Sequence, residues 1–210
     1  QRTGTEHIVI DPMETAQELT GKCVIFSAPS GAGKTSITRF LLSHYPNLSF
    51  SVSATTRSPR GQEQDGVDYH YISLAQFEGH IYQNDFLEFE MVYEGVYYGT
   101  LKSELDRIWN LGKTPVLDID VKGAIRVQAQ LKEAALSIFI MPPSVEVLKE
   151  RLESRKTETQ EAIQMRLDKA TYEMSFSHEF NAIVKNEVLE TACNDAANLL
   201  MNFLGPDFTK

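Results

Sequence analysis

Residues 23–35 read CVIFSAPSGAGKT. The apolar run at 23–26 is typical of a buried strand in a parallel sheet, and the apolar residues at 37, 40 and 41 follow helical spacing. Between them the sequence matches G-x-x-x-x-G-K-[ST], a loop that binds phosphate, at every position except the first, which is Ala28. The alternative is a glycine-rich turn without a ligand. The strand–loop–helix order favours the phosphate loop and predicts an α/β fold.

The residue types in this loop have chemical reasons. Glycines at 31 and 33 let backbone N–H groups turn toward phosphate oxygens, and the following helix adds its positive N-terminal dipole. Lys34 supplies a cation, and the Thr35 hydroxyl can ligate Mg²⁺. We expect a negative φ at Ala28, because Pro29 favours an extended residue before it. The residues assigned to nucleotide phosphates in this loop are Ala28, Pro29, Ser30, Gly31, Ala32, Gly33, Lys34 and Thr35.

Strands and helices alternate along most of the chain. Strands are expected at 48–53, 115–120, 136–141 and 182–184, and helices after the loop and at 101–108, 124–131, 145–152, 163–174 and 189–203. This order predicts a parallel sheet covered by helices on both faces. Residues 54–99 differ, because they are rich in Arg, Pro, Gly and Tyr. We interpret them as an inserted subdomain with a small sheet and a helix at 74–82.

Two acidic residues follow the strand predicted at 115–120. Asp118 and Asp120 would project from the same side of an extended strand. Carboxylates at the C-terminal ends of strands in phosphate-loop folds lie near the bound metal. The alternative is that these residues cap the next helix. We assign Asp118, with Thr35, as a metal ligand.

Two arginine clusters oppose the overall charge of −9. Arg57 and Arg60 flank a Ser-Pro pair, and two guanidinium groups so spaced suit bidentate binding of a phosphate; the alternative is two surface arginines on a loop. Arg151 and Arg155 share one helix face, and Arg166 lies on the next helix. These three predict a lid that closes over phosphates. The alternative is a solvated helix face that pairs with Glu150, Glu153 and Glu158.

Composition limits the classes of function. A chain of 210 residues with 42% hydrophobic residues can form a compact core. Its negative charge argues against a nucleic-acid partner. Cys23 and Cys193 are expected to be buried, reduced thiols. Because the sequence has no apolar stretch of about 18 residues and no visible signal peptide, we expect no membrane association and a cytoplasmic location. We interpret residues 1–12, which precede Met13, as an added segment.

Seven segments, in order and with matching spacing, resemble the guanylate kinase family. They span nearly all of the chain from residue 21 to about 204 and comprise residues 27–35, 51–60, 66–69, 86–88, 97–100, 117–123 and 142–144. Two features depart from the family pattern. The first glycine of the loop is replaced by Ala28, and the segment between Glu88 and Tyr97 is one residue longer than the commoner form.

The resemblance implies three structural parts. They are a core of residues 21–53 and 100–204, a GMP-binding subdomain at 54–99, and a helical lid at about 144–170 within the core. Residues 1–20 would form an N-terminal extension and residues 205–210 a tail. The resemblance also implies phosphoryl transfer from ATP to GMP, with Mg²⁺ as cofactor and with dGMP as a further acceptor. It gives no oligomeric state.

The resemblance also assigns roles to individual residues. The GMP phosphate would contact Arg57, Arg60, Tyr69 and Tyr98, and the guanine would contact Ser53, Glu88, Thr100 and Asp120. Lys34, Arg57, Arg151, Arg155 and Arg166 would be catalytic, and Asn186 would lie near the adenine. Guanine suits Glu88 chemically. The N1–H and 2-amino groups of guanine are neighbouring donors, and one carboxylate can accept a hydrogen bond from each of them. The rivals are a non-catalytic phosphopeptide-binding module of the same fold and a kinase for another phosphate acceptor.

Overall fold

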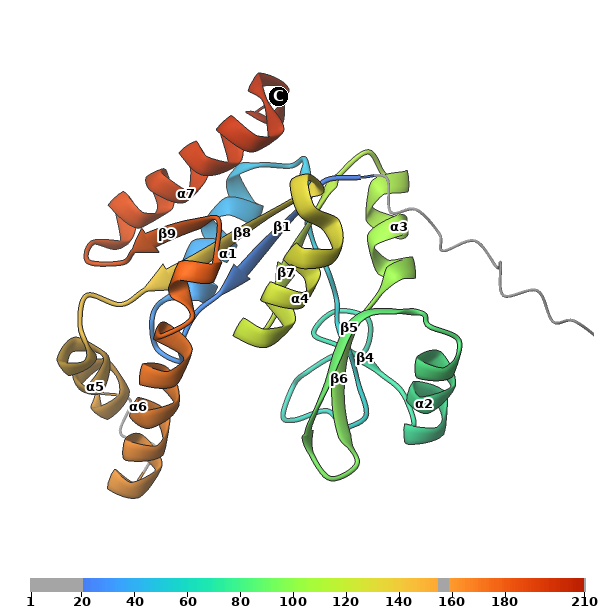
Figure 1. Cartoon of the computed structure of the whole chain (residues 1–210), viewed down its shortest axis with the longest axis horizontal. Helices are drawn as coiled ribbons and strands as arrows, with labels where there is room; N and C mark the ends of the chain where they lie inside the picture. Colours follow the sequence, from blue (N-terminus) through green and yellow to red (C-terminus); the bar gives the residue numbers. More distant parts are fainter. Residues whose placement is uncertain (1–20, 155–158, 210) are drawn as a thin grey trace, which may run out of the picture.

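The computed structural model describes residues 21–154 and 159–209, and its larger sheet has five parallel strands. Their order across the sheet is β2-β7-β1-β8-β9 (Figure 1). The strands are β1 (Cys23–Ser27), β2 (Leu48–Phe50), β7 (Thr114–Asp118), β8 (Ala135–Met141) and β9 (Ala182–Lys185). In the register of β1 with β7, Phe26 stands beside Asp118. The loop after β1 and the end of β7 are therefore neighbours.

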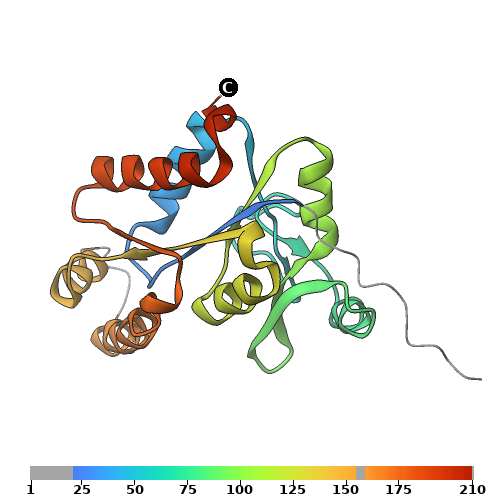
Figure 2. The ribbon, with the colours of Figure 1, turned by 45° about the horizontal axis from the view of Figure 1, so that its top comes forward.

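Helices cover both faces of this sheet (Figure 2). On one face α1 (Lys34–His44) and α7 (Leu189–Leu204) pack against Val24 and Phe26 of β1. On the other face α3 (Lys102–Asn110) and α4 (Val121–Leu131) pack against Cys23 and Ile25. Successive residues of β1 thus face opposite helix layers, as a strand buried on both sides requires.

The second sheet is small and mixed, with strand order β4-β3-β6-β5. It contains β3 (Ala54–Thr55), β4 (His70–Tyr71), β5 (Phe86–Tyr93) and β6 (Val96–Leu101), and α2 (Leu74–Tyr82) covers it. Strands β3 and β4 are parallel, and the other pairs are antiparallel. Phe77 of α2 stacks on Phe86 with ring centroids 4.3 Å apart. The β5–β6 pairing shifts register between Phe86 and Glu88 and again between Met91 and Tyr93, as β-bulges do.

A pair of helices lies at the opposite side of the molecule from the small sheet (Figure 1). The pair is α5 (Val145–Glu153) and α6 (Gln160–Met174), with its own small core that includes Leu148, Leu152 and Leu167. The Ser144 hydroxyl caps α5 by accepting a hydrogen bond from the N–H of Val147 at 3.2 Å. Short 3₁₀ helices occupy Lys132–Ala134, Ser177–Glu179 and Pro206–Thr209.

The predicted fold class is confirmed, with a helix-covered parallel sheet and a small mixed sheet. Two strand predictions were too long. β2 ends at Phe50, and β7 ends at Asp118 because Asp120 is already the N-cap of α4. Cys23 and Cys193 are buried, free thiols, as predicted. None of the helices in the described ranges has the length and apolarity needed to cross a bilayer.

Candidate active site

The loop between β1 and α1 has the backbone shape that phosphate binding requires. Gly31 and Gly33 have φ angles of 88° and 97°, which favour glycine, and Gly33 is the N-cap of α1. The only positive-φ residues other than glycine in the described ranges are Asn84 and Lys132. Ala28 therefore has a negative φ, as expected, and its β-carbon adds no backbone strain.

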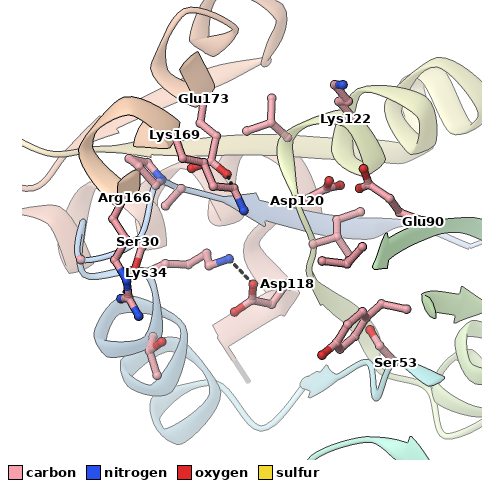
Figure 3. A pocket seen from close by; sticks show the side chains of 18 of the residues that line it. Ser30, Lys34, Ser53, Glu90, Asp118, Asp120, Lys122, Arg166, Lys169 and Glu173 are labelled. Carbon is pink, nitrogen blue, oxygen red and sulfur yellow. Dashed lines mark hydrogen bonds and ion pairs between the residues drawn. The ribbon is translucent and has the colours of Figure 1, made fainter. Parts of the chain in front are cut away.

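Lys34 and Asp118 meet in the cavity beyond the strand ends (Figure 3). The Lys34 ammonium group forms an ion pair with the Asp118 carboxylate. Both side chains are partly exposed, and the Thr35 side chain lines the same cavity. The parallel register explains the pairing, because it places the end of β7 beside the end of β1. A cation, a carboxylate and a hydroxyl therefore converge where the dipole of α1 is positive.

Asp120 both caps the next helix and lines the cavity, so the two interpretations offered for the acids after β7 apply together. Its side chain caps α4, because Oδ1 accepts a hydrogen bond from the N–H of Gly123 at 2.7 Å. Strand β7 ends at Asp118, so Asp120 lies just beyond it, although its backbone is still extended and Ile119 between the two acids is buried. Both acids line the cavity, in agreement with the expectation that they project to the same side. The helix cap thus holds Asp120 at the cavity wall with one oxygen engaged.

Glu88 is a buried carboxyl group at the inner end of β5. Its Oε1 accepts a hydrogen bond from the Thr100 hydroxyl at 2.8 Å. A β-carbon added to Gly123 would stand 2.9 Å from Glu88 Oε2 and 2.7 Å from Asp120 Oδ1, so a larger residue there would displace these carboxylates. Burial raises the pKa of Glu88, although the hydrogen bond from Thr100 opposes this. The Glu88 carboxyl group is therefore a buried hydrogen-bond acceptor, suited to a ligand that presents two neighbouring donors.

Arg57 is held by a carboxylate that sequence reasoning did not single out. Its NH1 and NH2 atoms donate to the two oxygens of Glu63 at 2.6 and 2.9 Å, and its Nε donates to the Tyr98 hydroxyl at 2.8 Å. The guanidinium carbon also lies 4.9 Å from the centroid of the Tyr69 ring. The pKa of Glu63 falls to about 2, mainly through its hydrogen bonds with Arg57. The backbone N–H of Arg60 joins the same carboxylate at 2.8 Å, while the Arg60 side chain is exposed.

The arginines of the helix pair differ in position. Arg166 on α6 reaches the phosphate loop, where NH1 donates to the Ser30 hydroxyl at 3.1 Å. Arg151 on α5 donates to the backbone oxygen of Asn186 at 3.2 Å. Arg155 lies outside the described residues. The helix pair therefore contacts the loop directly and through the segment after β9.

Asn186 holds the backbone of the phosphate loop through a hydrogen bond. Its side chain is buried, and Nδ2 donates to the backbone oxygen of Ala32 at 2.8 Å. A β-carbon on Gly33 would collide with the same amide nitrogen. This close approach gives Gly33 a second reason to be glycine, besides its φ. The structure thus places Asn186 against the loop backbone and outside the cavity wall.

A cavity of about 700 Å³ joins these groups. Its wall includes the sequence-predicted residues Ala28, Pro29, Ser30, Gly31, Gly33, Lys34, Thr35, Ser53, Tyr69, Glu88, Tyr98, Asp118, Asp120 and Arg166. The wall leaves out six predicted residues that the structure describes: Ala32, Arg57, Arg60, Thr100, Arg151 and Asn186. Arg57 and Thr100 contact wall residues, Tyr98 and Glu88 respectively. Arg57 and Thr100 therefore lie behind residues of the cavity wall and contact the cavity through them.

Several residues of the site were not predicted. Lys169 and Glu173 line the cavity from α6, three and seven positions after Arg166, and helical spacing could have identified them. Glu90 lies two positions after Glu88 on β5, so strand alternation could have identified it. Glu63 left a weaker signal, because its contact with Arg57 depends on the fold of residues 58–62.

Comparison with known proteins places this geometry in one family. The family model described as guanylate kinase matches residues 20–202. A guanylate kinase of Chlorobium chlorochromatii is 48% identical over 90% of this chain and 100% of its own length. One of Bacteroides thetaiotaomicron is 43% identical over 91% and 94%, respectively. The crystal structure of a guanylate kinase from Anaplasma phagocytophilum is 28% identical and matches with a TM-score of 0.67, covering 90% of this chain and 87% of that one.

The phosphate loop follows the carboxyl end of the central strand of a parallel sheet, and Asp118 ends the neighbouring strand; together they define a P-loop nucleotide-binding fold. Within that class the chain belongs to the guanylate kinase family.

Proposed function

We propose that this protein transfers the γ-phosphoryl group of ATP to GMP, giving ADP and GDP. Membership of the guanylate kinase family supports the reaction. The observation that carries it is one cavity with a phosphate loop at one end and a buried carboxyl group, Glu88, on its wall. The loop suits the triphosphate and Glu88 suits guanine, so the two substrates would bind with their phosphates between these sites.

On the ATP side, the loop from Ala28 to Thr35 would bind the phosphates, and Lys34 would contact the transferring group. Asn186 would shape the loop through its hydrogen bond to Ala32. Mg²⁺ fits this site, because the Asp118 carboxylate and the Thr35 hydroxyl are hard oxygen donors on one cavity wall. Magnesium on ATP usually needs only one or two protein oxygens, with phosphate and water completing its shell. It would neutralise charge on the phosphates.

On the GMP side, Glu88 would accept hydrogen bonds from N1–H and the 2-amino group of guanine. Thr100 and Ser53 would lie near the base, and Asp120 would border it. The GMP phosphate would contact Tyr69, Tyr98, Arg57 and Arg60. Adenine presents no such donor pair, so AMP would leave Glu88 buried without a partner. The site should therefore select guanine strongly and should accept dGMP, because none of these contacts requires the 2′-hydroxyl.

The three structural parts follow from these roles. We assign residues 21–53 and 100–204 to a core, 54–99 to a GMP-binding subdomain and about 144–170 to a lid. The contact of Arg166 with Ser30 supports a lid role for α6, with Arg151 and Arg155 as further cations. Closure would exclude water and limit wasteful ATP hydrolysis. We further infer a cytoplasmic enzyme without nucleic-acid or membrane partners.

No general base is needed in this mechanism. A phosphate monoester has a second pKa of about 6, so GMP is mostly a dianion at neutral pH and its oxygen is already nucleophilic. The protein must bring two polyanions together and align them. Lys34, Arg57, Arg151, Arg155 and Arg166 would supply the positive charge. Electrostatic stabilisation and positioning would thus account for catalysis.

The test is ADP release from MgATP in the presence of GMP, dGMP, AMP, CMP or UMP, with EDTA as a control. We expect metal-dependent release with GMP and dGMP alone. Release with a different base would keep the kinase and contradict the guanine site. No release with any acceptor, together with binding of a phosphoserine peptide, would identify the chain as a non-catalytic module of this fold.

A further inference from the structure

Glu90 belongs to the cavity wall but has no role in the proposed function. The register of β5 with β6 pairs Glu88 with Thr100 and Glu90 with Tyr98, without a shift between these pairs. Because alternate strand residues share a face, Glu88 and Glu90 project to the same side. Both line the cavity. Figure 3 shows the Glu90 side chain directed toward Asp120.

The Glu90 carboxyl group lies beside the carboxyl group of Asp120. The neighbouring Asp120 carboxyl group and burial raise the pKa of Glu90 to about 7, against the opposing effect of Arg126 and Lys122. One oxygen of Asp120 already accepts from the N–H of Gly123 at 2.7 Å. The two carboxyl groups therefore form a pair with oxygen atoms to spare, held in place by a helix cap and a strand.

The guanine edge offers more hydrogen atoms than Glu88 can accept. N1–H and one hydrogen of the 2-amino group match the two oxygens of Glu88, which leaves the second amino hydrogen without an acceptor. The Glu90–Asp120 pair lies next to Glu88, because Asp120 Oδ1 and Glu88 Oε2 both come within 3 Å of a β-carbon position on Gly123. A buried donor without an acceptor is costly, so this hydrogen needs a partner.

We propose that Glu90 determines specificity for the 2-amino group of guanine by accepting, together with Asp120, its second hydrogen. This inference rests on the proposed function, since it assumes that guanine binds at Glu88. Nucleotides whose base lacks the 2-amino group, such as IMP, gain nothing from Glu90. The 2′-hydroxyl is not involved, so GMP and dGMP depend on Glu90 equally.

The experiment measures dissociation constants of GMP, dGMP and IMP by calorimetry for the wild type, Glu90→Ala and Glu90→Gln. Glu94→Gln, an exposed position on the same hairpin, is the matched control. Glu90→Ala should weaken GMP and dGMP about tenfold and leave IMP unchanged, because one hydrogen bond is lost. Glu90→Gln should stay within about threefold of the wild type, because its amide can donate to Asp120 and still accept from guanine.

Three results would overturn the inference. Equal weakening of GMP and IMP by Glu90→Ala would show a general effect on the pocket. Weakening of GMP but not dGMP would place Glu90 at the ribose. An unchanged ratio of GMP to IMP affinity would remove any role in base choice. Failure of the wild type to phosphorylate GMP would overturn the proposed function itself, which separates the two failures.

Discussion

Lys34 and Asp118 form an ion pair that joins the phosphate loop to the end of the neighbouring strand. The pair follows from the parallel register, in which Phe26 of β1 stands beside Asp118 of β7. Lys34 is expected to contact phosphate, and Asp118 is expected to contact metal. Binding of MgATP would therefore replace one internal ion pair with two contacts to the ligand, which keeps both charges compensated.

Lys34→Ala should abolish transfer while the protein stays folded. The variant removes the cation that stabilises the transferring phosphoryl group, so kcat should fall by roughly 10³-fold or more. Steady-state ADP release measures this, and circular dichroism checks the fold. The exposed Lys113→Ala is the control and should retain full activity. Turnover of Lys34→Ala close to that of the wild type would contradict the assignment of the loop.

Asp118→Asn should raise the Mg²⁺ concentration needed for half-maximal activity. Asparagine has nearly the same shape but lacks the charge that attracts the metal, so high Mg²⁺ should restore part of the activity. A titration of Mg²⁺ at saturating ATP and GMP measures the shift. An Mg²⁺ curve identical to that of the wild type would show that Asp118 does not contact the metal.

Glu88→Gln should weaken recognition of the guanine base. Its kcat/KM for GMP should fall about 10- to 100-fold, because a charged acceptor of two hydrogen bonds is lost. The exposed Glu94→Gln serves as control. A preference for GMP over AMP equal to that of the wild type would show that Glu88 does not recognise the base.

The same variant should be more stable at neutral pH. Burial raises the pKa of Glu88, so the folded protein binds more protons than the unfolded chain between the two pKa values. Through this group, stability rises as the pH falls from the folded pKa toward the unfolded one. Glu88→Gln removes this dependence and keeps an acceptor for Thr100. Melting temperatures measured without nucleotide test it, and a lower Tm of the variant at pH 7 would contradict it.

Glu63→Gln should raise the KM for GMP several-fold with little change in kcat. Glu63 holds both terminal nitrogens of Arg57, so a neutral side chain leaves the guanidinium group less well positioned. KM and kcat from GMP titrations at saturating MgATP measure the effect. A lower KM in the variant would instead mean that Glu63 competes with the phosphate for Arg57.

Glu63 should also contribute to the loss of stability in acid. Its pKa is lowered to about 2, so its contribution to stability is present above the unfolded pKa near 4.5 and is lost as the pH falls toward 2. Glu63→Gln should therefore weaken the fall in Tm over this acid range. Equal slopes of Tm against pH for the two proteins would contradict the role of this ion pair.

The strand, loop and helix at 23–44 could be predicted because local rules determine each part. An apolar run, glycines that allow positive φ and a helical stripe are all readable in sequence. The ends of elements were harder to place. The strand predicted at 115–120 runs two residues past the observed end of β7 at Asp118, because alternation alone cannot show that Asp120 caps the next helix.

The network around Arg57 could not be predicted, because it depends on tertiary placement. Tyr98 lies 41 positions away and meets Arg57 through the β3–β6 pairing. Asn186 likewise meets Ala32 across 154 positions because β9 ends beside the loop. The family resemblance identified Asn186 and Tyr98 as site residues. Their actual hydrogen-bond partners required the fold.

The most direct test of the account follows the phosphoryl group itself. ATP labelled at the γ-phosphate is incubated with Mg²⁺, GMP and either the wild type or Lys34→Ala, and labelled products are separated. The account predicts that wild type places the label in GDP in equal amount to the ADP formed, whereas Lys34→Ala does not. Label released as inorganic phosphate without labelled GDP, or no release by the wild type, would contradict phosphoryl transfer to GMP.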